Sequence, residues 1–333
     1  MHTMTLLFRL CKTMRDFPSR MYQLCLALTA GIHSPTGISL RIECHIASKG
    51  KPPSDNDYQF MKKPLFEGVD VRIFVDCLEY LDKLNMEAAD IPVIREAIEA
   101  VIAPLGISIE EFALERIDYC QNVIVPSQKE RELLMFLWHK ASKCHKKLER
   151  INGKDSATAN KLYYKRMTDN YRVQLYDKEL ERRDKEKNAK PYELGVLRLE
   201  SQLHREHLMY HWWQYRTPRS FDVWADWSLR TAYLRQTERL FFRGDFYTLR
   251  RAETLLRKAG LSPKECQEIR QFMKNISESG FDYAEEQAKS TYLVNKYINQ
   301  LTSLGISPIP IPQNARTPYL ANPFRQFYER GCV

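Results

Sequence analysis

The chain has 333 residues, 44% of them hydrophobic, which is enough to bury the core of one large domain or of two ordinary ones. Its 51 basic and 42 acidic residues favour a polyanionic partner, although basic surfaces also suit membranes and acidic proteins. The eight cysteines form no Cys-x-x-Cys pair, which argues against a disulfide framework or a cysteine zinc site and indicates reduced thiols in a cytoplasm. The apolar segment 21–30 is shorter than a membrane span, so we expect neither a signal peptide nor a membrane protein.

The first part of the chain gives mixed signals. Residues 1–36 show no clear period, and we assign them no role. Strict alternation over 38–46 predicts a half-buried strand, and 69–75 predicts a second one. Isoleucines at helical spacing over 87–103 predict an amphipathic helix.

The next strand and helix carry the first candidate functional groups. Residues 114–120 alternate between polar and apolar and predict a third strand. Ser127 and Glu130 form a capping-box pattern that opens a helix of about 24 residues. Basic side chains lie off its apolar stripe, where they are candidates for DNA contact, although a solvated helix face explains them equally well: Lys143, Lys146, Lys147 and Arg150.

Two further alternating runs, 172–178 and 197–203, predict strands. The charged connector 179–190 has little to bury, so we expect an exposed helical extension or a mobile loop. The pattern then becomes mainly helical and ends in a proline-rich extended stretch. We expect an α+β fold, with a mostly antiparallel sheet that carries helices on one face and the active site on the other, followed by a helical C-terminal domain.

The expected domain boundaries follow from these patterns. They are an unassigned segment 1–36, a catalytic domain 37–212, a helical domain 213–312 and an extended tail 313–333. A second capping box, at Ser262, supports the helical domain.

Three strands bring chemically useful groups to one face. Alternation places Asp118 beside Arg116, Glu200 beside Arg198, and Tyr176 beside Lys178, each pair on its own strand. A phenol with two carboxylates that can hold Mg²⁺ or Mn²⁺ is a set that can cut a phosphodiester. The alternative is a sheet with one solvent face, where the charges alternate because they are exposed and form cross-strand ion pairs.

The same runs resemble a known family. The motifs Arg-Ile-Asp (116–118), Tyr-Asp-Lys (176–178) and Leu-Arg-Leu-Glu (197–200), with the closing stretch 304–312, are similar to those of rolling-circle replication initiators, namely the gene II protein family of filamentous phages and related plasmid initiation factors. The likeness spans roughly residues 110–312.

The resemblance implies a role for each residue. Tyr176 would be the nucleophile, with Lys178 stabilising the phenolate or the developing phosphate charge. Asp118 and Glu200 would hold the metal ion. Arg116 and Arg198 would either clamp a phosphate of the DNA or brace the carboxylates through bidentate pairs.

The resemblance also implies a reaction. The protein would nick an origin, keep the 5′ phosphate as a phosphotyrosyl ester, and release a 3′ hydroxyl for a host polymerase, aided by a host helicase and a single-strand binding protein in the bacterial cytoplasm. A homodimer is compatible with this function. Two alternatives stay open: a relaxase that mobilises an integrated element, and a non-catalytic DNA-binding regulator.

The chain departs from related nickases at its histidines. No His-hydrophobe-His motif occurs, and His204, His207 and His211 are spaced as on a helix, where a surface or interhelix role is expected. Aromatic residues nearby either stack on unpaired bases or pack in the core: Tyr163, Tyr164, Tyr171, Tyr192 and the tryptophans between 212 and 227.

Overall fold

A seven-stranded sheet carries the fold in the computed structural model, which describes residues 2–11, 13–46, 66–141, 162–165, 170–185 and 188–329. The strand order is β2-β3-β1-β4-β7-β6-β5, and β1 pairs antiparallel with both β3 and β4. The strands are β1 (Thr3–Cys11), β2 (Ile38–Ile46), β3 (Phe66–Asp76), β4 (Ala113–Ile124), β5 (Leu162–Lys165), β6 (Tyr171–Asp177) and β7 (Val196–His204). This confirms the predicted α+β class with an antiparallel sheet.

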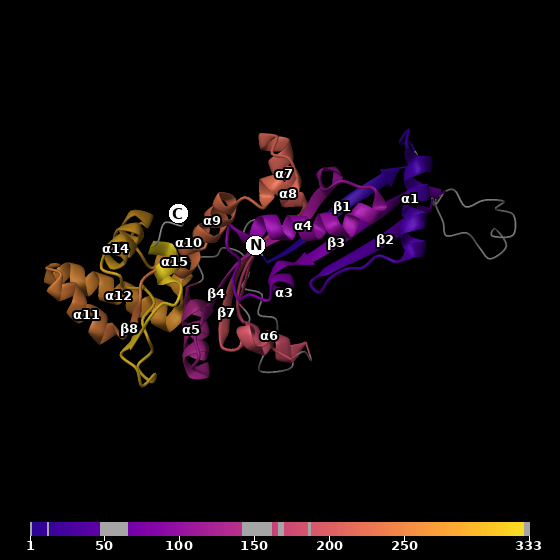
Figure 1. Cartoon of the computed structure of the whole chain (residues 1–333). Coiled ribbons are helices and arrows are strands. Elements are labelled where there is room, and N and C mark those ends of the chain that lie inside the picture. Colours follow the sequence, from indigo (N-terminus) through magenta and orange to yellow (C-terminus); the bar gives the residue numbers. More distant parts are fainter. Residues whose placement is uncertain are drawn as a thin grey trace, which may run out of the picture. The chain divides into compact units, whose positions relative to one another are not determined.

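Helices lie between and after the strands (Figure 1). Those up to residue 224 are α1 (Phe17–Ala30), α3 (Cys77–Leu81), α4 (Asp90–Ile102), η1 (Ala103–Leu105), η2 (Ile109–Glu111), α5 (Gln128–Lys140), α6 (Lys178–Asp184), η4 (Pro191–Glu193), α7 (Arg205–Tyr215) and α8 (Phe221–Trp224). The remaining elements are α9 (Trp227–Gln236), α10 (Glu238–Phe241), β8 (Phe246–Tyr247), α11 (Leu249–Lys258), α12 (Pro263–Ser279), α13 (Phe281–Glu286), α14 (Thr291–Ser303), β9 (Tyr319–Leu320) and α15 (Arg325–Glu329).

The chain divides into two compact units, and each consists of two separate stretches. Unit 1 comprises Met1–Tyr119 and Leu203–Arg230, and unit 2 comprises Cys120–Gln202 and Thr231–Val333. Unit 1 includes the segment 1–36, to which the residue pattern gave no role, and both units take residues from the predicted catalytic range 37–212.

Strand β1 is a central strand of the sheet, so the segment 1–36 has a structural role that the sequence analysis missed. Its residues alternate, with Met4, Leu6, Phe8 and Leu10 buried on one face. The apolar segment 21–30 lies within α1, which contacts β1.

The core of unit 1 lies between the sheet and its helices. The valines and the isoleucine of β3 are at most 1% exposed, and α4 buries Ile94, Ile98 and Val101, as its predicted helical spacing requires. The Phe8 and Phe112 rings pack with centroids 5.8 Å apart. The opposite face of β1, β2 and β3 therefore carries the polar residues of these strands.

The core of unit 2 forms around Trp138 of α5. Its ring contacts three phenylalanines of the C-terminal region, Phe241, Phe246 and Phe324. Ser127 caps α5 as predicted, since its side chain accepts a hydrogen bond from the Glu130 amide. The helix ends at Lys140, and the rest of the predicted 24-residue span lies outside the described residues.

Two predictions about unit 2 need correction. The connector 179–190 begins as a helix, α6, as expected, but it is partly buried rather than exposed, because Glu181 forms an ion pair with Lys178 and both side chains have little exposure. The tail after residue 312 is also more than an extended strand: Tyr319–Leu320 pairs with Phe246–Tyr247, and α15 follows. In both segments ion pairs or backbone bridges supply the packing, which hydropathy alone does not reveal.

We expect Asp70→Asn to destabilise the protein by about 2 kcal/mol at pH 7, because charge-assisted hydrogen bonds are lost. Asp70 lies on the polar face of β3, fully buried, and accepts from Arg9 at 2.7 and 2.9 Å. Arg72 at 3.1 Å and His45 at 3.0 Å complete the cluster. Hydrogen bonds from Arg9, assisted by His45, lower the pKa of Asp70 to about 2.

The sign of the pH dependence follows from this lowered pKa. The stabilisation by Asp70 is complete above the unfolded-state pKa of about 3.9 and is lost as the pH falls through about 2. Urea unfolding between pH 7 and 2 should therefore show that the difference in free energy of unfolding between wild type and Asp70→Asn shrinks below pH 4. Asp82→Asn, at an exposed position, is the control. A difference in free energy of unfolding between wild type and Asp70→Asn that stays the same at all pH values would contradict the prediction.

Candidate active site around Tyr176

Tyr176 is held rigidly at the end of β6. The next residue, Asp177, caps α6 by accepting from the Leu180 amide. Asp177 also accepts a 2.6 Å hydrogen bond from Arg131, and both partners are almost fully buried. Because a buried ion pair costs several kcal/mol to break by removing one partner, this junction fixes the backbone beside the phenol.

The Tyr176 hydroxyl donates a 3.0 Å hydrogen bond to the Glu200 carboxylate on β7. Burial, with the negative charge of Glu200, raises the pKa of Tyr176 well above its ordinary value. The phenol is therefore protonated at neutral pH, and its proton already points at a carboxylate. Two residues from separate predicted motifs are thus in direct contact.

Arg198 is a buried cation that interacts electrostatically with both Tyr176 and Glu200. It is 1% exposed, and its Nε donates a 2.7 Å hydrogen bond to the Asn122 side chain. Burial lowers the pKa of Arg198, but Tyr176, Cys120 and Glu200 raise it more, so the guanidinium stays charged beside the phenol. Of its two expected roles, this burial fits bracing the site rather than contacting DNA from the surface.

The ammonium of Lys178 pairs with a carboxylate of its own helix. It is the first residue of α6 rather than part of the strand, and its ammonium donates to Glu181 at 2.7 Å. Its Nζ lies 6.0 Å from the centre of the Tyr176 ring. Burial and the charge of Arg198 lower the pKa of Lys178. Of the two basic residues, Arg198 has the closer electrostatic link to the phenol.

Strand β7 is buried on both faces from Val196 to Leu203, and Glu200 is only 2% exposed. The alternative of a sheet with one solvent face is therefore wrong for this strand. A buried carboxylate needs hydrogen bonds or a nearby cation. The Glu200 carboxylate accepts such a hydrogen bond from the Tyr176 hydroxyl.

Asp118 has its own set of donors on β4. Arg116 donates to both of its oxygens, at 2.9 and 2.7 Å, and the Thr3 hydroxyl donates to one of them. Asp118 is 1% exposed, whereas the Arg116 side chain is 40% exposed. Arg116 therefore braces the carboxylate through a bidentate pair, which was one of its two expected roles.

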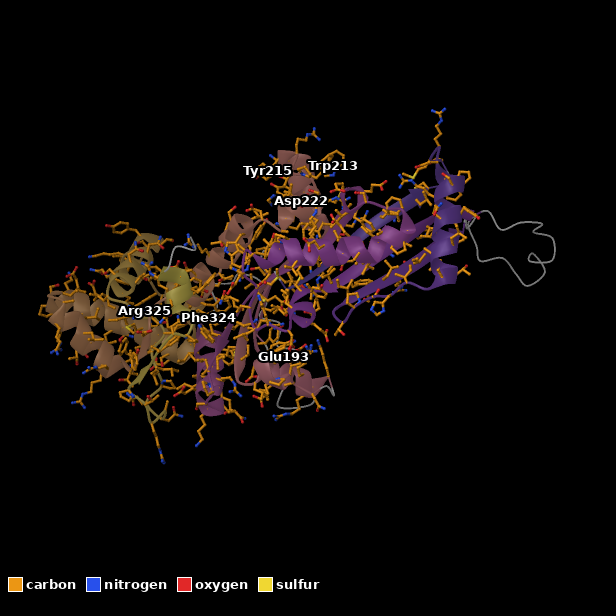
Figure 2. All side chains as sticks on the ribbon, in the orientation of Figure 1. Glu193, Trp213, Tyr215, Asp222, Phe324 and Arg325 are labelled. Atoms are coloured by element: carbon orange, nitrogen blue, oxygen red, sulfur yellow. The ribbon has the colours of Figure 1, made fainter. Side chains whose placement is uncertain are left out.

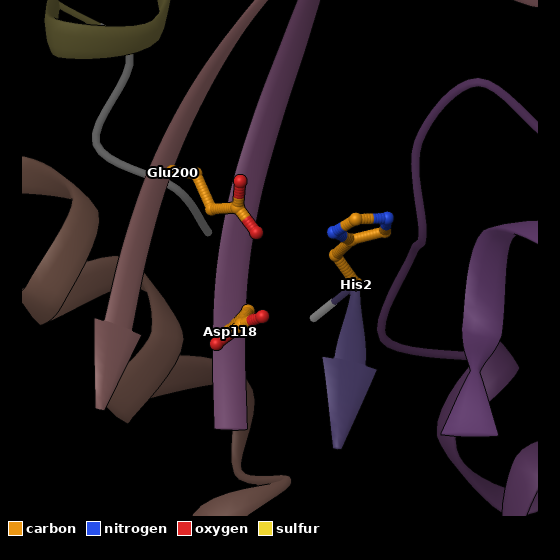
Figure 3. Close-up of side chains that lie close together, drawn as sticks. All are labelled: His2, Asp118 and Glu200. Atoms are coloured by element: carbon orange, nitrogen blue, oxygen red, sulfur yellow. The ribbon is translucent and has the colours of Figure 1, made fainter. Parts of the chain in front are cut away.

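His2, Asp118 and Glu200 form a group that could hold a metal ion (Figure 3). Each offers one ligand atom, and these atoms lie within 4.8 Å of one another. On its other side, the His2 Nε2 atom lies 3.7 Å from Asp76, a carboxylate partner of the kind that orients metal-binding histidines. Two carboxylates and one imidazole suit Mn²⁺ well and Mg²⁺ less well, because Mg²⁺ prefers oxygen ligands.

The sequence predicted two of these three ligands and missed the third. His2 belongs to no motif and precedes a strand that was not predicted. The alternation of Met4, Leu6, Phe8 and Leu10 was the available signal, since it places residue 2 on a strand. In a sheet, however, residue 2 shares the face of those buried residues, so the pattern alone does not point it toward Asp118.

The other predicted groups lie elsewhere. His207 and His211 are on α7 with ring centroids 4.8 Å apart, and burial lowers the pKa of His207 to about 4. Within the described residues, neither belongs to a cluster that could hold a metal. Trp224 is fully buried, whereas Trp213 and Tyr215 are exposed on α7 (Figure 2).

The remaining candidate DNA contacts fall into two groups. The side chains of Tyr163 and Tyr164 and the four predicted basic residues lie outside the described side chains: Lys143, Lys146, Lys147 and Arg150. Tyr171 is buried and packs on Tyr233, which fits a core role rather than base stacking.

Comparison with known proteins gives no match to a family model, to a curated protein or to a solved structure. The resemblance to replication initiators therefore stays a prediction. Among the described residues, the helices are all too short or too polar to cross a lipid bilayer.

Proposed function

We propose that the protein is a DNA strand transferase that nicks and rejoins a replication origin through Tyr176, as phage and plasmid rolling-circle initiators do. The observation that carries the proposal is the 3.0 Å hydrogen bond from the Tyr176 hydroxyl to Glu200. A nucleophile and a base within hydrogen-bond reach is the arrangement that covalent catalysis requires. The net charge of +9 favours the polyanionic substrate.

The proposed step begins with the protonated phenol. The Tyr176 oxygen attacks the scissile phosphorus while its proton passes to Glu200. The new bond joins tyrosine to the 5′ phosphate, and the bond from phosphorus to the 3′ oxygen breaks. That oxygen takes up a proton and becomes the 3′ hydroxyl from which a host polymerase starts, with a host helicase opening the duplex. The reverse attack by a 3′ hydroxyl rejoins the strand.

The neighbouring residues support this chemistry. Arg198 offsets the negative charge that develops on the phenol oxygen, and its burial strengthens that effect. Asp118, Glu200 and His2 would hold Mn²⁺ or Mg²⁺, which supplies Lewis acidity at a phosphate oxygen. Arg116 and Thr3 keep the Asp118 carboxylate in place for that ion.

The test is a search for the covalent intermediate. The wild-type protein is incubated with a supercoiled plasmid that carries its own gene and flanking DNA, with Mn²⁺ or Mg²⁺, and the products are separated under denaturing conditions. We expect open circles with the protein on the 5′ end of the nick and a free 3′ hydroxyl. If the plasmid is bound but stays intact, the function is that of a DNA-binding regulator and the proposal fails.

A further inference from the structure

A cavity of about 450 Å³ opens on the polar face of unit 1, close in the strand register to Asp118. Its volume is within the range of small-ligand sites. It is lined by residues of β1, β2, β3, α3 and β4 and by Gly37 before β2, and the lining includes Thr5, Phe74, Asp76, Glu79 and Arg116.

The strand register arranges the lining in two rows. One row crosses four strands through Ser39, Phe74, Thr5 and Arg116. The parallel row, two residues further along, contains Asp76, Thr3 and Asp118. Since residues two apart share a face, both rows face the same side of the sheet. Phe74 and Arg116 are two strand spacings apart, about 10 Å, which is the reach of one nucleotide.

The wall of the cavity beside Gly37 requires glycine at this position. Gly37 has φ +85°, and a Cβ atom there would lie 2.6 Å from the Tyr80 amide nitrogen and 2.8 Å from the Asp76 carbonyl oxygen. The Gly37 carbonyl accepts a 2.7 Å hydrogen bond from the Asp76 amide. The chain before β2 therefore approaches the start of α3 closely and closes this side of the cavity.

The polarity of the lining distinguishes two ends. Phe74 is an apolar ring with 38% exposure in the middle of a polar row, where burial does not explain it. On the side of β3 and α3, Glu79 and Asp76 bring two carboxylates, and Asp76 also caps α3; both repel a phosphate but accept hydrogen bonds from amino groups. On the side of β1 and β4, Thr5 and Arg116 follow Phe74 along its row, and the guanidinium, which also pairs with Asp118, favours a phosphate.

We propose that this cavity is a subsite for one unpaired nucleotide of the DNA strand, whose base carries an exocyclic amino group. The base stacks on Phe74, its amino group donates to the carboxylates of Asp76 and Glu79, and its phosphate contacts Thr5 and Arg116 beside Asp118. The proposal rests on the strand-transfer function and adds to it the class of base that is held next to the metal-binding carboxylate. Carboxylates discriminate between bases by accepting from amino groups, and every base can stack on an aromatic ring.

The experiment measures binding of fluorescein-labelled 12-nucleotide strands to the full chain without added metal, so that no strand is cut. Homopolymers of deoxycytidine and thymidine place the same base in the cavity in every register, and a strand of abasic sites removes the base altogether. We expect the deoxycytidine strand to bind several-fold more tightly than the thymidine strand, because thymine has no amino group. The abasic strand should bind most weakly.

Two variants, each with a matched control, test separately the stacking on Phe74 and the hydrogen bond from the base to Glu79. Phe74→Ala should weaken binding of the deoxycytidine strand about tenfold, the loss expected for one base stacked on an aromatic ring. Glu79→Gln should reduce the preference for deoxycytidine over thymidine. Tyr22→Ala, at a 63% exposed aromatic of the same unit, and Glu87→Gln, at an exposed carboxylate, should change neither value.

Several results would overturn the subsite. They are wild-type affinity in Phe74→Ala, equal affinity of wild type for the abasic and deoxycytidine strands, or an unchanged base preference in Glu79→Gln. If Phe74→Ala does not fold, ultraviolet crosslinking of a 5-bromodeoxycytidine strand to the wild type decides, because the crosslink should map to β3 at Phe74. The strand-transfer proposal is judged separately, by the covalent adduct on the plasmid, so either proposal can fail while the other stands.

Discussion

Replacing Tyr176 with Phe is expected to abolish the covalent adduct and to reduce plasmid nicking roughly 10⁴-fold or more, because the attacking oxygen is removed while the ring stays in place. The free energy of unfolding should fall by only about 1–3 kcal/mol, since Glu200 loses one buried donor. Gel separation of supercoiled and open circles measures the nicking, and urea unfolding measures the stability.

Tyr119→Phe is the matched control for this substitution. Tyr119 is also fully buried, and its hydroxyl donates a 2.7 Å hydrogen bond to the Trp224 carbonyl, so the same atom is lost from a comparable environment. The control should lose similar stability and still form the adduct. An adduct that persists in Tyr176→Phe would assign the nucleophile to another residue.

Loss of His2 should change which metal ion supports nicking. With two carboxylates and one imidazole, we expect the wild type to reach full activity at a lower concentration of Mn²⁺ than of Mg²⁺. His2→Ala should weaken Mn²⁺ binding on the order of 10- to 100-fold and reduce the preference of the protein for Mn²⁺ over Mg²⁺. Electron paramagnetic resonance of free Mn²⁺ measures this affinity without relying on activity.

His33→Ala is the control for the metal experiment, since His33 is exposed in the same unit. It should leave Mn²⁺ affinity unchanged. If His2→Ala binds Mn²⁺ as tightly as the wild type, the imidazole is not a ligand. Asp118→Asn would then show whether the carboxylates alone hold the ion.

The strands that alternate regularly could be predicted from the sequence, because a half-buried strand imposes period two on its residues. This holds for β2, β3 and the strands that carry Asp118 and Tyr176. Strand β7, which carries Glu200, also alternates in sequence, although both of its faces are buried. The contact between Tyr176 and Glu200 needs the strand order as well, which places β6 beside β7. Period two alone gives the face of each residue and not its neighbour on another strand.

The sequence did not reveal burial that depends on ion pairs formed only in the folded geometry. The connector after Tyr176 looks solvated because it is charged, yet Arg182 forms an ion pair with Glu193 at 2.7 Å and Lys178 pairs with Glu181. Such pairs compensate the cost of burying charge only in the folded geometry. His2 was missed for a similar reason, since a single histidine becomes a candidate ligand only through its three-dimensional neighbours.

The division of each unit into two stretches constrains the order in which the protein can fold during synthesis. Unit 1 needs residues 203–230, so its first 119 residues must wait while the ribosome makes 83 residues of unit 2, from Cys120 to Gln202. Unit 2 in turn gains the Phe324 contact to Trp138 only after 185 further residues have followed Trp138 out of the ribosome. Contacts so far apart in sequence favour slow folding, so hydrophobic surface of both units stays exposed in the nascent chain until the second stretch of each unit has been made.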